Sequence, residues 1–244
     1  MTSLTPEPRY AIYFVPGAET ALYRFGASVL GYDCYTGRDT ALIDGVDSSS
    51  WIDVVCEPRV YGFHATLKAP FRLAKGLHEA DLERAVLSFS LDQPAVLAGE
   101  LVVRELGSFI ALVPKTPRPL LDRFALACVR EFDRYRAPLT EPERERRLAA
   151  DLSVRQTENL EKWGYPYVFE DFRFHMTLTG LLPLPERTRA LRFLCNKFEQ
   201  VPAAISLAVD QIVVARQIDK SSPFHMIRRA QLGQSPYRPF AYSC

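Results

Sequence analysis

The sequence has few cysteines, and they follow no recurring pattern. Five cysteines stand among 244 residues, an odd number with no CxxC pair. Such scattered thiols argue against a disulfide framework and against a zinc site, and they favour reduced thiols in a cytoplasmic setting. We therefore expect no structural metal and no cofactor. The cysteines are Cys34, Cys56, Cys128, Cys195 and Cys244.

Long apolar runs and an excess of one charge are also missing. No apolar stretch reaches the roughly 18 residues that a membrane-spanning helix needs. The first residues, MTSLTPEPRY, carry prolines and a glutamate where a signal peptide needs a basic start and an apolar run. Thirty basic residues balance twenty-nine acidic ones, so no global field favours duplex DNA or an anionic membrane. We expect a cytoplasmic protein with neither as a partner.

Histidine is scarce as well, yet two of the four histidines share one local frame. The stretch YGFHATLKAPF (61–71) contains His64, and FRFHMTLTG (172–180) contains His175. Both read Phe, His, any residue, Thr, Leu. At this composition the coincidence is expected on the order of once in five hundred such chains. The repeat therefore indicates an internal duplication built around the two histidines.

The order of the expected elements agrees with a duplication. A strand over RYAIYFVPG and a helix closed by Gly31 precede the first histidine strand. Each histidine strand is then followed by a helix and a hairpin, an order typical of antiparallel sheets with helices on one side. We expect an α+β, internally duplicated bilobal fold, in which two antiparallel sheets flank a central cleft and helices pack outside. The lobes are predicted at about 1–115 and 116–244, with a charged helical excursion at about 138–170.

Strand periodicity predicts which side chains share a face. Alternate residues of a strand point the same way, so each histidine lies beside the threonine two residues on, roughly 7 Å away. The opposite parity places the Phe, Ala or Met, and Leu positions in a core. If the two strands meet about a pseudo-twofold axis, one cleft collects His64, Thr66, His175 and Thr177.

Two histidines with two hydroxyls suit chemistry on a phosphodiester. Near pH 7 one neutral imidazole can accept a proton from the nucleophile, while a charged one gives a proton to the leaving oxygen. Threonine hydroxyls can donate to the non-bridging oxygens as charge builds there. We therefore predict His64 and His175 as catalytic residues and Thr66 and Thr177 as phosphate ligands, with no metal.

Three further residues are candidate substrate ligands. Parity places Lys68 and Arg173 on the same faces as the histidines, where they could supply positive charge, unless a β-bulge reverses the assignment. Tyr61 falls on the apolar side by parity unless the Tyr-Gly step bends the chain, so core packing and stacking on a base or sugar are both open. His78 and His225 lack the frame and are left out.

Other readings of the same residues stay open at this point. The histidines could be satisfied residues on two unrelated strand edges. The cleft could bind a phosphate or RNA without performing chemistry, which predicts binding that weakens with salt and no product. A metallohydrolase that adds Asp171 to the two histidines is disfavoured, because neither HxH nor HExxH spacing occurs.

The doubled frame resembles the 2H phosphoesterase superfamily, whose members carry two His-x-Thr/Ser motifs on a bilobal, internally duplicated α+β fold. The residues that carry the resemblance are His64, Thr66, His175 and Thr177. The longer strings, with YAIYFVPG and RFGASVLGYD, are similar to an uncharacterised bacterial branch often encoded among phosphonate-degradation genes. The resemblance implies a metal-independent phosphodiesterase acting on a cyclic or activated phosphodiester. Its substrate would be a small phosphorylated metabolite or an RNA end with a 2',3'-cyclic phosphate.

One departure from the superfamily pattern concerns the stretch from Glu141 to Phe172, which is longer and more charged than the link of a minimal member. Trp163, Tyr165 and Tyr167 stand just before the second motif. We expect this stretch to shape or cover the cleft, as a lid does.

Overall fold

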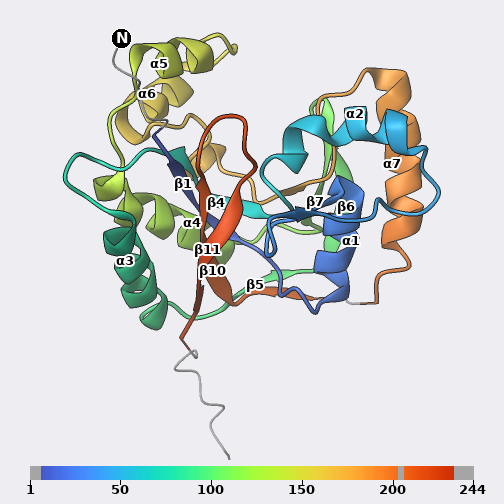
Figure 1. Cartoon of the computed structure of the whole chain (residues 1–244), viewed down its shortest axis with the longest axis horizontal. Coiled ribbons are helices and arrows are strands. Elements are labelled where there is room, and N and C mark those ends of the chain that lie inside the picture. The colour runs from blue at the N-terminus through green and yellow to red at the C-terminus, as the bar shows by residue number, and fades with distance from the viewer. Residues whose placement is uncertain (1–6, 203–205, 234–244) are drawn as a thin grey trace, which may run out of the picture.

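The computed structural model describes residues 7–202 and 206–233. At its centre is a seven-stranded sheet in which neighbouring strands are antiparallel (Figure 1). In spatial order the strands are β11 (His225–Gln231), β10 (Gln211–Gln217), β1 (Arg9–Phe14), β4 (Ala65–Phe71), β8 (Met176–Thr177), β7 (Phe109–Pro114) and β6 (Leu101–Leu106). Two short pairs lie apart from it, β2 (Tyr32–Asp33) with β3 (Arg38–Asp39), and β5 (Val96–Gly99) with β9 (Leu207–Val209).

The α+β class and the antiparallel strands are confirmed, and the two expected sheets are joined into one. The join is the pairing of the two histidine strands, β4 and β8, with Ala65 opposite Met176. The lobes also exchange strands: β6 and β7 lie beyond β8, while β10 and β11 lie beyond β1. Each hairpin thus covers a strand edge that the other half of the sequence leaves open. A boundary near residue 115 therefore does not divide the sheet.

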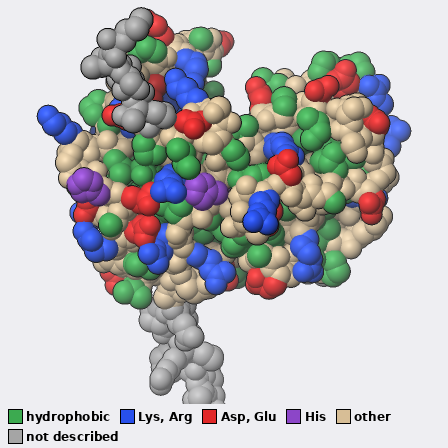
Figure 2. Space-filling view, in the orientation of Figure 1, with side chains coloured by type: hydrophobic (Ala, Val, Ile, Leu, Met, Phe, Trp, Pro, Cys, Tyr) green, Lys and Arg blue, Asp and Glu red, His purple; other side chains and the backbone are tan. Residues whose placement is uncertain are grey.

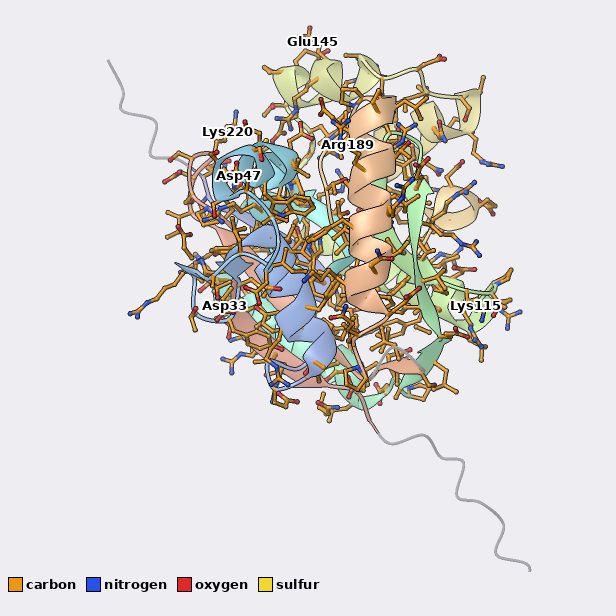
Figure 3. The ribbon with its side chains drawn as sticks, turned by 90° about the vertical axis from the view of Figure 1, so that its right-hand side faces the viewer. Asp33, Asp47, Lys115, Glu145, Arg189 and Lys220 are labelled. Atoms are coloured by element: carbon orange, nitrogen blue, oxygen red, sulfur yellow. The ribbon has the colours of Figure 1, made fainter. Side chains whose placement is uncertain are left out.

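Four helices cover one face of the sheet. α3 (Glu79–Leu91) packs on β10 and β11, α4 (Pro119–Phe132) on β4, and α7 (Leu184–Phe198) on β6 and β7. α1 (Ala21–Leu30) lies beside α7, with the rings of Phe25 and Phe198 5.3 Å apart (Figure 3). Figure 3 also shows Arg189 on α7, whose inner side buries Ala190 and Leu194. The opposite face of the sheet is left for the site.

The first helix forms as its sequence predicts. Thr20 caps α1 by accepting a hydrogen bond from the backbone N–H of Tyr23 at 3.1 Å, and Gly31 ends it at φ +65°. The middle of the helix contains Gly26, where an added Cβ would lie 2.1 Å from the Phe63 ring. This close approach lets the helix cover Phe63, which is fully buried just ahead of β4. Burying such a ring stabilises the fold by about 2 kcal/mol.

A further helix, α2 (Ser48–Arg59), has no clear periodic signal in the sequence. Only Trp51, Val55 and Pro58 of it are buried. Its start is set by Asp47 (labelled in Figure 3), which accepts a hydrogen bond from the N–H of Ser50 at 3.0 Å. The N-cap and three buried side chains therefore suffice to form this helix, which borders the site.

The stretch from about 138 to 170 contains short helices that lie beside the sheet at the top left of Figure 1. It contains α5 (Glu141–Leu148) and α6 (Val154–Trp163); η1 (Asp133–Tyr135) leads into it and η2 (Phe169–Asp171) closes it. An ion pair between Arg72 and Glu143 at 3.2 Å joins it to the end of β4, and one between Arg144 and Glu161 at 2.7 Å joins α5 to α6. No helix within 7–202 and 206–233 is both long and apolar enough to cross a membrane.

Candidate active site

The two histidine motifs meet at the centre of the sheet. Because Ala65 pairs with Met176 in an antiparallel register, the residues on either side also face each other, each histidine opposite the threonine of the other motif. Ala65 and Met176 are fully buried on the helix side, so the flanking residues point to the other face. One face of the sheet therefore carries all four motif residues, His64 beside Thr177 and Thr66 beside His175.

Both imidazoles are oriented by the same contact. Nδ1 of His64 donates to the carbonyl oxygen of Gly62 at 2.8 Å, and Nδ1 of His175 donates to that of Arg173 at 2.7 Å. In each motif the acceptor stands two residues before the histidine. With Nδ1 protonated, a neutral ring keeps its lone pair on Nε2. The pseudo-symmetry thus extends from the sequence to the tautomer, and in both neutral rings the lone pair lies on Nε2.

His64 lies in the more enclosed surroundings. Its ring stacks on Tyr13 with the centroids 3.7 Å apart, and the hydroxyl of Thr66 donates to its Nε2 at 3.0 Å. Burial is the main cause that lowers the pKa of His64 to about 4; the hydrogen bond to Gly62 opposes it, and the charge of His175 acts in the same direction as burial. His64 is therefore neutral at pH 7.

His175 is held by fewer contacts. Its ring is tilted against Phe109 with the centroids 5.7 Å apart, and no described residue hydrogen-bonds to its Nε2. Burial lowers its pKa as well, and the hydrogen bond to Arg173 works in the opposite direction. The pair is therefore asymmetric in environment although it is symmetric in position.

Two cavities flank the histidines and share Phe109 as a wall. The smaller, about 210 Å³, is lined by His64, Thr177 and Tyr61; the larger, about 520 Å³, by His175 and Thr66. α2 borders the first cavity through Glu57, and the excursion borders the second through its tyrosines. Figure 2 shows the molecule hollowed at the top between the part bearing α5 and α6 and the part bearing α2. The volumes suit a small ligand.

Tyr61 turns into the site because the chain bends at Gly62. Gly62 has φ +72°, and an added Cβ would lie 2.7 Å from Cβ of Cys34, so only glycine fits. The bend removes Tyr61 from the strand parity that would have sent it to the core. Its ring lies 6.3 Å from that of His64 and stacks on Phe224 at 5.4 Å. The same glycine supplies the carbonyl that orients His64.

The prediction that Lys68 faces the cleft is wrong, and a β-bulge is the reason. Tyr13 pairs with Thr66 and Ile12 with Lys68, so one step along β1 matches two steps along β4. The extra residue turns Lys68 to the helix side, where it is buried. There its Nζ donates to Asp133 at 2.9 Å and to the carbonyl oxygen of Val129 at 3.3 Å. Lys68 joins the sheet to α4 and η1.

Arg173 is exposed and lines the larger cavity, as its parity suggests. Asp171, the carboxylate of the metal reading, is bound instead by Arg155 at 2.8 Å and by Gln156 at 3.1 Å. Within the described part of the chain, no group of three or more His, Cys, Asp or Glu side chains is placed to hold a metal ion. The carboxylate that a His-His-Asp centre needs is therefore engaged by Arg155 and Gln156.

The remaining two histidines lie outside the site. His78 is exposed at the start of α3, where its backbone N–H donates to Asp81 at 2.7 Å. His225 lies on β11 with Nε2 3.5 Å from Arg216. Sequence reasoning missed two rings that do belong to the site, Tyr13 and Phe109. The sequence around Tyr13 contains no motif that marks it as functional. Tyr13 reaches the site because it pairs with Thr66 where β1 and β4 lie side by side.

A protein-family profile matches residues 66–225, and its description is "Protein of unknown function (DUF1045)". The match spans most of the chain and includes the second histidine motif, so the protein belongs to this family.

Curated relatives extend the likeness at the sequence level. A protein of Janthinobacterium sp. (strain Marseille) named ribose 1,5-bisphosphate phosphokinase PhnN is 38% identical over 223 residues, covering 88% of this chain and 49% of its own length. A protein of Laribacter hongkongensis with the same name is 36% identical over 174 residues, covering 71% of this chain and 40% of its own. The chain thus spans about half the length of these relatives or less. The sequence has no GxxxxGK[ST] phosphate-binding loop.

Solved structures resemble the chain more distantly. A crystal structure described as a phosphoesterase aligns with a TM-score of 0.44 and 14% identity, covering 94% of this chain and 99% of that one. E. coli LigT complexed with ATP aligns with a TM-score of 0.43 and 13% identity over the same shares.

Proposed function

We propose that this protein is a metal-independent phosphodiesterase that acts on a cyclic or otherwise activated phosphodiester, as members of the 2H phosphoesterase superfamily do. The observation that supports it most is the arrangement of the two motifs: two imidazoles with equivalent tautomers and two hydroxyls on one sheet face, each histidine opposite the other motif's threonine. One phosphorus centre between the rings would contact all four.

In this mechanism Thr66 and Thr177 bind the phosphate. Their hydroxyls donate to the two non-bridging oxygens, whose negative charge grows as the nucleophile attacks. The hydroxyl of Thr66 now donates to Nε2 of His64 at 3.0 Å. Turning that hydroxyl toward a phosphate oxygen frees Nε2 to accept a proton, so binding of the phosphate prepares the base.

His64 acts as the general base and His175 as the general acid. A bound phosphodiester anion favours protonation of one imidazole, and a proton on His175 lowers the pKa of His64 further. Nε2 of His64 takes a proton from water while the water oxygen bonds to phosphorus. The bond from phosphorus to the leaving oxygen breaks, and that oxygen takes the proton of His175. The product is a phosphomonoester.

The substrate class is a small phosphorylated sugar ester, with an RNA 2',3'-cyclic phosphate end as the second candidate. The cavity volumes of about 210 and 520 Å³ favour a ligand of a few rings over a long polymer. The curated relatives named for a ribose 1,5-bisphosphate kinase support a link to phosphorylated pentoses and to phosphonate metabolism. Because this chain lacks a phosphate-binding loop, we do not extend the kinase activity to it.

Hydrolysis of cytidine 2',3'-cyclic phosphate and of a ribose 1,2-cyclic phosphate, followed by ³¹P NMR, tests the proposal and reports which bond breaks. We expect a phosphomonoester product whose formation withstands EDTA. Loss of activity with EDTA that zinc restores would favour the metal reading. Binding that weakens with salt, without product at any pH, would instead assign a non-catalytic phosphate- or RNA-binding module.

A further inference from the structure

A basic cavity adjoins the larger histidine cavity. It encloses about 340 Å³ between β6, the end of β7, the start of α4 and the residues that lead into β8. The two cavities share three lining residues, Leu106, Phe172 and Arg173. Because Arg173 stands two residues before His175, the basic cavity begins next to the second histidine motif. Its volume lies in the range of small-ligand sites.

The charged side chains that line this cavity are mainly basic. One of them, Asp122, is acidic, and four are basic, namely Arg104, Lys115 (labelled in Figure 3), Arg118 and Arg173. Glu100 pairs with Lys115 at 2.9 Å and so neutralises one of the four. The cavity keeps an excess of positive charge, which favours an anionic ligand.

The three arginines of the cavity have donors to spare. Within the described residues, no carboxylate lies within ion-pair distance of Arg104, Arg118 or Arg173, and none of the three side chains forms a hydrogen bond. Arg118 is half-buried, and its Nε is buried without a partner; the other two are exposed. A guanidinium with free donors can bind a phosphate through two parallel hydrogen bonds.

The strand register places Arg104 on the same face of the sheet as the site. Arg104 pairs with Ala111 across β6 and β7, and Ala111 pairs with Thr177 across β7 and β8. Directly opposed residues share a face, so the three side chains form one row across the sheet. Two strand spacings separate the backbones of Arg104 and Thr177 by about 10 Å. The long side chain of Arg104 shortens that gap to the span of a sugar with a phosphate at each end.

The smaller histidine cavity carries the opposite charge. Among the described residues that line it, Glu57 is the one carboxylate, and none is Lys or Arg. A second anionic group is therefore disfavoured beside His64 and favoured beyond His175. In the proposed mechanism His175 protonates the leaving oxygen, so the sugar that carries this oxygen extends on the same side as the basic cavity. The charge difference and the mechanism thus orient the substrate in the same direction.

We propose that Arg104 and Arg173 bind a phosphomonoester carried by the leaving sugar, and that Arg118 adds charge from the far wall of the basic cavity. This inference rests on the proposed function and deepens it, because it fixes which end of the substrate faces which cavity. It also narrows the substrate to sugar cyclic phosphates that bear a second phosphate. Two guanidiniums match the three oxygens of such a group.

The test compares hydrolysis of cytidine 2',3'-cyclic phosphate with that of the same nucleotide carrying a 5'-phosphate. We expect wild-type kcat/KM to favour the 5'-phosphorylated substrate by about tenfold or more, the effect of one hydrogen bond between charged groups. Arg104→Gln and Arg173→Gln should each remove most of this preference, and Arg118→Gln a smaller part. Arg189→Gln is the matched control: Arg189 is exposed on α7 (Figure 3), lines neither cavity, and should keep the preference.

The two substrates also separate two roles for Arg173. If Arg173 contacts the second phosphate, Arg173→Gln lowers kcat/KM for the 5'-phosphorylated substrate alone. An equal loss for both substrates would place Arg173 at the reacting phosphate and overturn its assignment here. Thermal unfolding checks that each variant folds. Arg118→Lys replaces Arg118→Gln if the latter does not fold, because lysine keeps the charge without the bidentate geometry.

Binding distinguishes this inference from the proposed function. Calorimetry compares cytidine 3',5'-bisphosphate with cytidine 3'-phosphate, neither of which is a cyclic diester. Tighter binding of the bisphosphate that depends on Arg104 and Arg173 supports the second site even if no cyclic phosphate is hydrolysed. Equal kcat/KM for the two cyclic nucleotides, or an unchanged preference in both Arg104→Gln and Arg173→Gln, would overturn the second site and leave the phosphodiesterase proposal intact.

Discussion

The two histidine strands are alike in sequence and differ in support. β4 has seven residues and is paired on both sides, with β1 and β8, whereas β8 has two residues between β4 and β7. His64 stacks on Tyr13 and accepts a hydrogen bond from Thr66, while His175 is tilted against Phe109 and donates a hydrogen bond to the carbonyl oxygen of Arg173. Both histidines are half-buried, but the strand of the first is longer, and the cavity of the second is bordered by the excursion.

This difference teaches how a symmetric pair can take unequal roles. The backbone contact that sets each tautomer is the same, so the duplication alone gives two equivalent bases. Burial lowers the pKa of both rings, and that of His64 falls to about 4. A proton supplied with an anionic substrate then settles on the less enclosed ring. The assignment of base and acid follows from the surroundings, not from the motif.

The largest effect should come from removing either imidazole. His64→Ala and His175→Ala are each expected to lower kcat by 10² to 10⁴, the range that general acid–base catalysis contributes. Binding of a nucleoside 3'-phosphate should change little, because the threonine hydroxyls remain. Turnover and calorimetric Kd are measured on the same preparations. His78→Ala, at an exposed helix start, is the control, and full activity in either site variant would rule out the acid–base pair.

Losing a threonine hydroxyl should cost less than losing a histidine. Thr66→Val and Thr177→Val keep the shape and remove one donor to the phosphate, for which a loss of about 10² in kcat is expected. Thr66→Val should be the more severe, because it also removes the hydrogen bond to Nε2 of His64. Thr66→Ser and Thr177→Ser should restore most of the rate. Equal activity in a valine variant and wild type would exclude that hydroxyl from phosphate binding.

Acid should destabilise the protein through its buried histidines. The pKa of His64 is about 4 in the folded chain and about 6.5 when unfolded, so below pH 6.5 the unfolded state binds more protons. Its stability contribution is complete above pH 6.5 and is lost as the pH falls through about 4, amounting to at most roughly 3 kcal/mol. Urea unfolding between pH 7.5 and 4.5 should show this loss in wild type and a smaller loss in His64→Gln. An identical pH slope in both would contradict the lowered pKa.

Lys68 should matter for stability and not for chemistry. Lys68→Met leaves Asp133 with only Arg136, and we expect the free energy of unfolding to fall by about 1 to 3 kcal/mol. The kcat of the folded variant should stay near that of wild type, measured at a temperature well below its melting point. Lys115→Met, which removes a half-exposed pair with Glu100, is the matched control and should change stability little. A large loss of kcat without loss of stability would indicate that Lys68 has a role in the active site.

Much of the fold and of the site could be predicted locally. The helix ending at Gly31, the hairpin at 107–108 and the helical excursion follow from apolar period, turn residues and charge. The FHxTL repeat identified both histidines and both threonines as candidate site residues. This was possible because the alternation of side chains along a strand can be predicted without knowing which strands pair with it. The prediction for Lys68 was wrong because the β-bulge between β1 and β4 depends on the register of the two strands. The sequence of one strand alone does not determine that register.

Local chemistry in the sequence therefore determined which residue types recur, which of them share a strand face, and where most helices begin and end. The tertiary structure alone decided that β4 and β8 pair directly, that hairpins are exchanged between the lobes, and that the ring of Tyr13 stacks on His64. These contacts join residues far apart in the chain. Their energy comes from packing and desolvation that exist only once the sheet is assembled.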